Sequence, residues 1–210
     1  MRKFTLLLAA LFMMAATALA DKYPIDSYEE PRVGDTPPAA EWNALSEGLH
    51  ATWGSRDVLY TIHRVPKLTE TAETEISAWR GERANLEAVL YSKSNQGNLK
   101  VRFVDANSKV VSWCKANFLN YVITDDYKSC GTHNMSLLKW LVPDVIDQDK
   151  PHAVPACETR PVWCSIEVPR DAKAGEQKMT LQVLDENDKV LKNLTLTLNV
   201  IDRTLPEVAN

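Results

Sequence analysis

The sequence contains no apolar run long enough to cross a membrane. Its most apolar stretch, Leu6 to Met14, lies at the start of the chain. That stretch is shorter than the roughly 20 residues that a spanning helix needs, and no later one is a better candidate. We therefore expect no transmembrane segment.

Basic charge is also scarce. The chain has 24 Lys and Arg side chains against 28 Asp and Glu. Without Arg2 and Lys3 the balance is 22 to 28, a formal charge of −6, and no basic stripe remains. Nucleic acid, whose binding requires such a stripe, is therefore not an expected partner.

Motifs for catalysis and metal binding are missing as well. There is no Gly-x-Ser-x-Gly elbow, no phosphate-binding glycine loop and no His-Glu-x-x-His helix. A zinc site needs two ligand pairs, and only Cys130 with His133 approaches one. We expect no catalytic residue, metal or cofactor in this chain.

The first twenty residues have the pattern of a signal peptide. Arg2 and Lys3 precede the apolar run, and Ala18-Leu19-Ala20 forms a cleavage signature before Asp21. No Cys follows that signature, so a lipid anchor on an N-terminal Cys has no acceptor. We expect an exported protein that is periplasmic, cell-surface or secreted.

Four cysteines lie in the expected mature chain: Cys114, Cys130, Cys157 and Cys164. An even count in an exported protein suggests disulfides, and four cysteines allow three pairings. Cys114 with Cys130 would close a loop of about 15 residues, worth about 3 kcal/mol in the chain-entropy model. This pairing is the one we favour from the sequence.

The domain boundaries follow from composition. Residues 21–47 are rich in proline and acidic residues, which predicts an extended N-terminal arm, either disordered or laid across the domain. A short helical turn is expected around Glu41 to Ser46. Residues 48–203 are long enough to bury one core, and residues 204–210 would begin a linker.

Strand patterns recur through residues 48–203. We predict strands over Leu49–Trp53, Val58–Ile62, Asn85–Ser92, Leu99–Val104, Phe118–Thr124, Val162–Val168, Lys178–Leu184 and Leu194–Ile201. The last two alternate aliphatic and polar residues and are joined by Asp185-Glu186-Asn187-Asp188, which predicts a hairpin with one buried face.

Helical periodicity is weak. The only plausible helix is Ser136 to Val145, which Pro143 interrupts. Many short strands with turns between them predict an all-β fold, a β-sandwich of immunoglobulin-like or jelly-roll type, with few short helices.

Paired carboxylates and tryptophans are the candidate site residues of this sequence. Asp185-Glu186 could suggest glycoside cleavage, but hairpin-turn chemistry explains it better. Asp125-Asp126 reads as the start of a loop. Of the six tryptophans, three lie in or beside apolar strands and are expected to pack in the core: Trp53, Trp79 and Trp163. Sugar stacking is a hypothesis for the others: Trp42, Trp113 and Trp140.

A charged turn motif leads to a family resemblance. In the motif Trp79-Arg80-Gly81-Glu82-Arg83, Glu82 is expected to pair with either arginine while Trp79 covers the core. The segment AWRGERANLEAVLYSK (78–93) resembles a segment of the N-terminal domain of glycoside hydrolase family 123, the β-N-acetylgalactosaminidase family. Similar stretches follow the family's order: GLHATWGSRDVLY (48–60), NYVITDD (120–126) with CG (130–131), LVPDVID (141–147) and RPVWCSIEVPRDAKAG (160–175).

The sequence departs from the family pattern at a few positions. Glu87 stands where such domains often have Gln, and Gln177 and Met179 replace a frequent Tyr and Gly. These differences affect only local details. The resemblance still covers nearly the whole mature chain.

The resemblance implies an accessory role. It implies a non-catalytic β-sandwich that packs against and stabilises a (β/α)8 glycosidase barrel, here expected to be absent from the chain. The family's catalytic Asp-Glu pair belongs to that barrel and cannot be placed on Asp185-Glu186. The alternatives are a free-standing carbohydrate-binding module that uses exposed Trp residues to bind glycans, or a surface interaction domain.

Overall fold

The computed structural model describes residues 28–31, 36–124, 140–148 and 150–207. It divides the chain into two compact units, residues 1–30 and residues 31–210, and the fold below is that of the second. The expected signal peptide (1–20) and much of the expected arm (21–47) lie outside the described residues.

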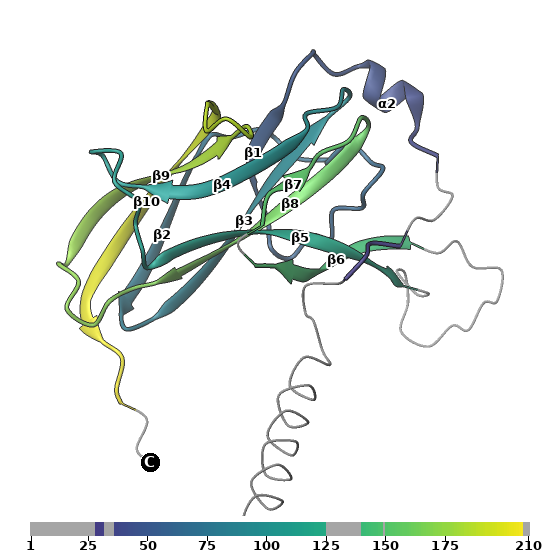
Figure 1. Ribbon diagram of the computed structural model, residues 1–210. Helices are drawn as coiled ribbons and strands as arrows, with labels where there is room; N and C mark the ends of the chain where they lie inside the picture. Colours follow the sequence, from purple (N-terminus) through teal and green to yellow (C-terminus); the bar gives the residue numbers. More distant parts are fainter. Residues whose placement is uncertain (1–27, 32–35, 125–139, 149, 208–210) are drawn as a thin grey trace, which may run out of the picture. The chain divides into compact units, whose positions relative to one another are not determined.

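The described part of the second unit is a two-layer β-sandwich (Figure 1). It contains helix α2 (Ala39–Asn43) and ten strands: β1 (His50–Gly54), β2 (Glu73–Arg80), β3 (Arg83–Ser92), β4 (Asn98–Val104), β5 (Cys114–Thr124), β6 (Trp140–Asp147), β7 (His152–Ala153), β8 (Glu158–Glu167), β9 (Gly175–Leu184) and β10 (Val190–Thr204). The prediction of an all-β sandwich is confirmed.

Each sheet has five strands. The first sheet has the order β1-β3-β8-β5-β6, and all its neighbours are antiparallel. The second has the order β2-β10-β9-β4-β7, in which β2 and β10 run parallel. Strands far apart in the sequence thus lie side by side, since β10, the last strand of the chain, pairs with the edge strand β2.

The β9–β10 hairpin forms as its alternation predicts. Leu194 lies opposite Leu181 and Leu196 opposite Met179. All four side chains are buried because one face of each strand points into the sandwich. The tip also behaves as predicted, since Asp185 Oδ1 accepts hydrogen bonds from the Asn187 and Lys189 amides, both at 2.9 Å.

The core lies between the sheets. It is formed mainly by aliphatic residues of β3, β8, β9 and β10, with Phe103 and Phe118 from β4 and β5. Trp53 joins the layers, because its indole is buried and its Nε1 donates to Thr195 O of β10 at 3.0 Å. The expectation that Trp53 packs in the core is confirmed, and its polar atom is satisfied as burial requires.

A second, smaller core covers the outer face of the first sheet. Trp42 of α2 and Tyr60 pack there against Val89 and Tyr91 of β3. Trp42 is only 1% exposed, and its Nε1 donates to His63 O at 3.0 Å. The expected strand Val58–Ile62 is wrong, since this segment contains turns and no strand. Its apolar residues are used to cover a sheet instead of extending one.

Two other sequence expectations need correction. The expected helix Ser136–Val145 is wrong over its described part, which is strand β6. Strand β6 is at the edge of its sheet, where Pro143 is tolerated because fewer ladder hydrogen bonds are required. Strand β2 was not predicted, because its outward residues, such as Glu73 and Glu75, are polar and its inward ones are mixed.

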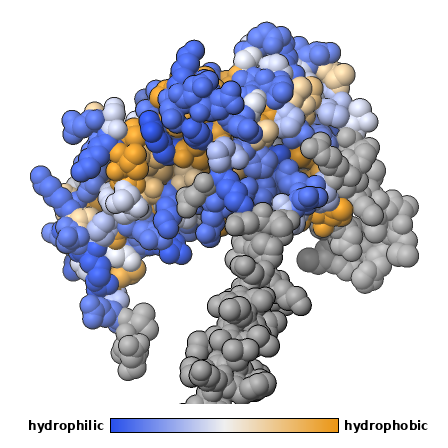
Figure 2. Space-filling view, viewed as in Figure 1, coloured by the Kyte–Doolittle hydropathy of each residue, from blue (hydrophilic) through white to orange (hydrophobic). Residues whose placement is uncertain are grey.

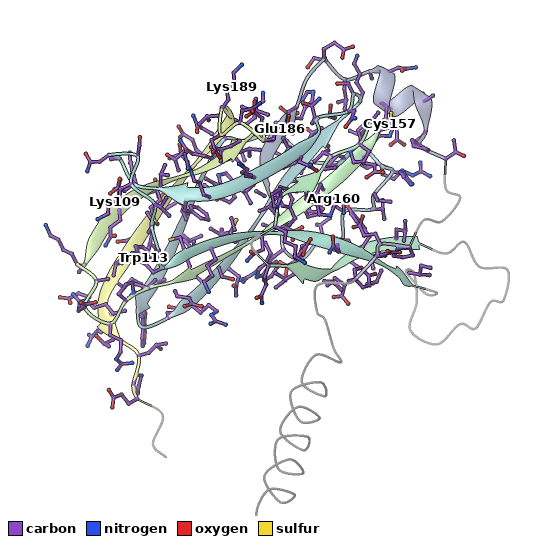
Figure 3. All side chains as sticks on the ribbon, viewed as in Figure 1. Lys109, Trp113, Cys157, Arg160, Glu186 and Lys189 are labelled. Atoms are coloured by element: carbon purple, nitrogen blue, oxygen red, sulfur yellow. The ribbon has the colours of Figure 1, made fainter. Side chains whose placement is uncertain are left out.

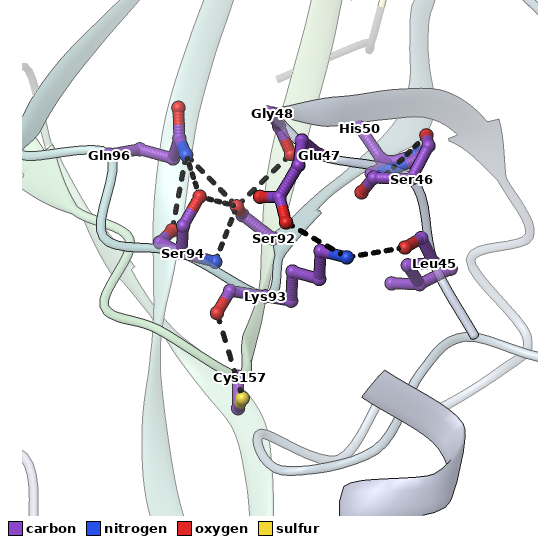
Figure 4. Close-up of polar contacts among 10 residues, drawn as sticks. All are labelled: Leu45, Ser46, Glu47, Gly48, His50, Ser92, Lys93, Ser94, Gln96 and Cys157. Atoms are coloured by element: carbon purple, nitrogen blue, oxygen red, sulfur yellow. Dashed lines mark hydrogen bonds and ion pairs between the residues drawn. The ribbon is translucent and has the colours of Figure 1, made fainter. Parts of the chain in front are cut away.

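A polar network attaches the segment after α2 to the end of β3 (Figure 4). Lys93 Nζ donates to Leu45 O at 2.8 Å and pairs with Glu47 at 3.0 Å. Ser92 Oγ donates to Gly48 O at 3.1 Å and accepts from Gln96 Nε2 at 2.9 Å. The segment of residues 45–50 is therefore held against the β3–β4 turn.

Gly54 is expected to tolerate no side chain. A Cβ atom there would lie 2.7 Å from Tyr60 Oη and 2.7 Å from Val89 Cγ2. We predict that Gly54→Ala lowers the free energy of unfolding by about 1–3 kcal/mol, the usual cost of overpacking. Equilibrium urea unfolding measures it. Because Val89→Ala makes room for the new methyl group, the double variant should cost less than the sum of the two single variants. Additive costs would contradict the steric explanation.

Candidate functional site

The paired carboxylates do not form a catalytic site in the part of the chain that the structure describes. Asp185 caps the β9–β10 turn, and the neighbouring Asp188 accepts a hydrogen bond from Lys100 Nζ at 2.9 Å. Figure 3 labels Glu186 and Lys189 at this exposed hairpin tip. The interpretation of Asp185-Glu186 as turn residues agrees with this geometry. Asp125-Asp126 lies outside the described residues.

Neither a metal cluster nor a membrane-spanning helix is found among the described residues. No group of three or more His, Cys, Asp or Glu side chains is arranged to hold an ion there. Cys130 and His133, the nearest approach to a zinc pair in the sequence, lie outside the described residues. Within the same ranges, no helix combines the length and apolar character that crossing a bilayer requires.

The three described cysteines are free thiols: Cys114, Cys157 and Cys164. Burial raises the pKa of the Cys114 thiol to about 12, and it also raises the pKa of Cys164. These two therefore behave as small apolar core residues that are poor nucleophiles. Cys157 lies at the edge of the polar network, with Sγ 3.8 Å from Lys93 O (Figure 4).

The favoured pairing of Cys114 with Cys130 is not seen in the structure. Cys114 is a free thiol, and its Sγ lies 3.4 Å from Met179 Sδ inside the core. Cys130 lies outside the described residues.

One cluster has the connectivity of a Ser-His-Glu triad. Ser46 Oγ lies 3.3 Å from His50 Nε2, and His50 Nδ1 lies 2.9 Å from Glu70 Oε1. Tyr91 Oη also donates to Glu70, and this bond together with His50 lowers the pKa of that carboxyl. The sequence pattern did not indicate this cluster, because its members are 4 and 20 residues apart on unrelated elements.

Its hydrogen bonds do not suit a nucleophilic triad. His50 Nε2 lies 3.3 Å from both Ser46 Oγ and Ser46 O, so it is shared between the hydroxyl and the backbone carbonyl and is not directed at the hydroxyl alone. A catalytic base is hydrogen-bonded to the hydroxyl that it activates. The imidazole also stacks on the Tyr91 ring, with centroids 5.0 Å apart. We interpret the cluster as a structural clamp between β1, β3 and the segment before β2.

The tryptophans are in three environments. Trp42 and Trp53 are buried, so sugar stacking by Trp42 is excluded. Trp79 is 40% exposed, so the expectation that it packs in the core is wrong. Trp113 and Trp163 are partly exposed. Trp140 starts strand β6, but its side chain lies outside the described residues.

Trp79 belongs to a small exposed apolar pair. It lies on β2 directly beside Ile201 of β10, which is 37% exposed. Their outward neighbours on these strands are polar, among them Ser77 and Asn199, and the exposed Val190 lies at the other end of β10. On the face visible in Figure 2, hydrophilic residues predominate and hydrophobic ones are exposed in patches. The Trp79–Ile201 pair is thus apolar among polar outward neighbours on β2 and β10.

The charged residues of the turn motif pair differently from the prediction. Glu82 Oε2 accepts from the Trp79 amide at 2.7 Å and pairs with neither arginine within the described residues. Arg80 pairs with Asp202 at 2.7 Å, and Arg83 pairs with Glu167 at 2.6 Å. Gly81, with a φ of 79°, makes this turn possible, since few other residues adopt that conformation.

The chain leaves β10 on the same surface. The Leu205 amide donates to Arg80 O at 2.9 Å, and Arg170 Nη2 donates to Leu205 O at 2.8 Å. We name this region the exit surface and define it by five residues: Trp79, Arg80, Ile201, Asp202 and Leu205. It combines an exposed indole, an aliphatic side chain and an ion pair beside the last described residues.

Trp113 lines a groove of about 540 Å³ at one end of the sandwich. Figure 3 labels Trp113 at the end away from α2 and Cys157. The groove, named the Trp113 groove, is lined chiefly by Trp113, Pro169, Asp171, Lys173, Glu176 and Gln177. It joins the two sheets, because Trp113 precedes β5 while Glu176 and Gln177 belong to β9.

A buried carboxyl lies on the outer face of the first sheet. Glu87 of β3 is opposite Trp163 of β8, which in turn is opposite Asn117 of β5. Glu87 is only 4% exposed, and its Oε1 has no hydrogen-bond partner among the described residues. Desolvation raises the pKa of Glu87 to about 8. The sequence signals only a departure at this position and does not reveal the burial.

Comparison with known proteins agrees with this architecture. The model of the glycoside hydrolase 123 N-terminal domain matches residues 53–185. A solved family 123 glycoside hydrolase from Clostridium perfringens, studied for glycolipid glycan hydrolysis, is similar with a TM-score of 0.60 and 22% identity. The similarity covers 75% of this chain and 28% of the hydrolase, so the chain spans less than a third of that protein.

Other comparisons add less. The N-terminal domain of PorA is similar over 74% of this chain and 99% of its own, with 10% identity and a TM-score of 0.34. That score is too low to support an inference. No curated protein matches the chain.

Proposed function

The chain belongs to the family of glycoside hydrolase 123 N-terminal domains, and on this premise we propose that it is an exported, non-catalytic accessory domain. Its role is to pack against and stabilise a (β/α)8 catalytic domain of β-N-acetylgalactosaminidase type, in the same protein or in a neighbouring gene product. The observation that carries the proposal is the family match over residues 53–185, which concerns the N-terminal domain and no catalytic domain.

The exit surface is the face that we assign to this contact. A domain connected through residues 205–207 would begin beside Trp79 and Ile201, because Leu205 is bonded to Arg80 and Arg170. An exposed indole beside an aliphatic side chain gives a partner apolar area to bury, and Trp and Arg are enriched among residues that dominate interfaces. The Arg80–Asp202 pair adds a polar rim.

The non-catalytic part of the proposal has a direct test. We expect the purified chain, residues 21–210, to release no chromophore from β-GalNAc or β-GlcNAc substrates above a heat-treated control. Turnover that co-purifies with the chain through successive columns would refute the proposal.

The accessory role is tested by looking for an encoded catalytic domain and by mutating the exit surface. We expect a family 123 catalytic domain to be encoded in the same gene or beside it, and to co-purify with this chain when both are expressed. Trp79→Ala combined with Ile201→Ser should reduce the recovered complex about tenfold or more, since hot-spot truncations cost 2 kcal/mol or more.

A matched control is available on the same strand. Val190 is 37% exposed, as Ile201 is, but lies at the other end of β10, about 36 Å away. Val190→Ser should leave the complex unchanged. Equal losses in both variants would assign the contact elsewhere, and the lack of any encoded catalytic domain would remove the accessory role.

A further inference from the structure

We propose that the Trp113 groove is a binding site for an uncharged sugar unit of a glycan. The inference is independent of the contact assigned to the exit surface, because the two regions use different residues. It begins from the chemistry of the groove. A pyranose ring has an apolar face and a rim of hydroxyl groups, so its site needs an aromatic wall together with polar donors and acceptors.

The groove supplies both kinds of group. Trp113 provides an indole that is partly exposed beside the cavity. Asp171 and Glu176 offer carboxylate oxygens that accept from hydroxyls, Lys173 offers a donor, and Gln177 offers an amide that does both. Ligand sites generally combine an apolar wall with a few convergent polar groups, and this groove has that composition.

The charged groups are available to a ligand. Asp171 and Lys173 are exposed and make no ion pair or side-chain hydrogen bond with any other described residue. Glu176 is only loosely paired, with Lys178 Nζ at 3.8 Å. Arg80, Arg83 and Arg170, by contrast, all have partners.

The loop that forms the groove is held in place. Arg80 Nε donates to Ala172 O at 2.8 Å, and Gln177 Nε2 donates to Lys173 O at 2.9 Å. The Ala172 amide closes a turn onto Pro169 O at 3.1 Å. Because the loop is already ordered by these bonds, binding would cost little further conformational entropy.

Charge identifies the class of ligand. Two carboxylates and one ammonium give the groove a formal charge of −1. An anionic sugar, such as a sialylated or sulfated residue, would meet two carboxylates and be disfavoured. An uncharged hexose or N-acetylhexosamine meets no such repulsion and satisfies the donors and acceptors.

The experiment uses the mature chain and a printed glycan array containing uncharged, sialylated and sulfated glycans, followed by calorimetry with free N-acetylgalactosamine and galactose. We expect binding to uncharged glycans, with a dissociation constant on the order of 1 mM for a single sugar. Trp113→Ala should weaken binding about tenfold or more.

Trp79→Ala is the matched control, because it removes an exposed indole outside the groove and should leave binding unchanged. Trp113 also packs against the core, so the surface variant Asp171→Asn, expected to weaken binding severalfold, tests the site if Trp113→Ala does not fold. Silence across the array, binding only to anionic glycans, or equal losses in Trp79→Ala and Trp113→Ala would overturn the proposal. None of these outcomes depends on a catalytic partner.

Discussion

Glu87→Gln is expected to make the protein more stable at pH 8 and to change its stability little at pH 5. Glu87 is buried on β3, its Oε1 has no partner among the described residues, and its pKa is raised from 4.5 to about 8. Gln has nearly the same shape as the protonated acid and does not titrate. It is also the residue that the family resemblance leads one to expect at this position.

The direction follows from proton linkage. Unfolded Glu87 ionises near pH 4.5, whereas the folded protein keeps the proton until about pH 8. Between these values the folded state holds one more proton, so stability falls by about 1.4 kcal/mol for each unit that the pH rises. The total loss between pH 5 and pH 8 is about 4 kcal/mol, a large part of a typical domain's stability.

Urea unfolding followed by tryptophan fluorescence at pH 5, 6, 7 and 8 measures this effect. As the pH rises from 5 to 8, the free energy of unfolding of the wild type should fall increasingly below that of Glu87→Gln. Glu75→Gln, an exposed change on β2 that removes the same charge, should leave the pH dependence as it is in the wild type. Parallel curves for Glu87→Gln and the wild type would show that Glu87 is not a buried acid.

Arg160→Ala is expected to lower the free energy of unfolding by about 3–5 kcal/mol, the usual cost of breaking a buried ion pair. Arg160 of β8 is 1% exposed, and its Nη2 lies 3.2 Å from Glu158 Oε2, whose side chain is 12% exposed. Its Nη1 donates to Leu119 O at 3.4 Å, and the guanidinium lies 4.9 Å from the centre of the Tyr121 ring.

Two further variants separate charge from packing. Glu158→Ala combined with Arg160→Ala should cost less than the sum of the two single variants, because both single changes break the same ion pair. Arg160→Lys should fall between the wild type and Arg160→Ala, because an ammonium keeps the charge but loses the planar contact with Tyr121. Equilibrium unfolding at pH 7 compares them, and fully additive costs in the double variant would contradict the role of the ion pair.

Local patterns predicted the strands whose two faces differ. The alternation in β9 and β10 was enough to assign their buried face and their turn, because a strand repeats every two residues and one face must be dry. The same reasoning found β1, β3, β4, β5 and β8, with ends that differ by a few residues. The family resemblance rests on contiguous segments and is likewise a property of the sequence.

Other elements depend on partners far along the chain. Strand β2 exists because β10 pairs with it in parallel, and residues 58–62 form no strand because they cover the first sheet. Trp42 is buried and Trp79 exposed although both flank apolar segments, since the packing of neighbouring elements sets exposure. The burial of Cys114 beside Met179 is a further example, because β5 and β9 are far apart in the sequence.

The candidate sites also depend partly on local sequence and partly on contacts between distant segments. The sequence points to Trp113 as a possible platform, but Asp171 and Glu176 become its neighbours only when the β8–β9 loop folds beside the start of β5. In the sequence Glu87 does not differ from other acidic residues. Its burial beside cross-strand neighbours, which raises its pKa, appears only in the folded sheet. Short-range periodicity therefore specifies which residues form strands, whereas exposure, ionisation and the shape of a groove arise from contacts between distant segments, which no local pattern encodes.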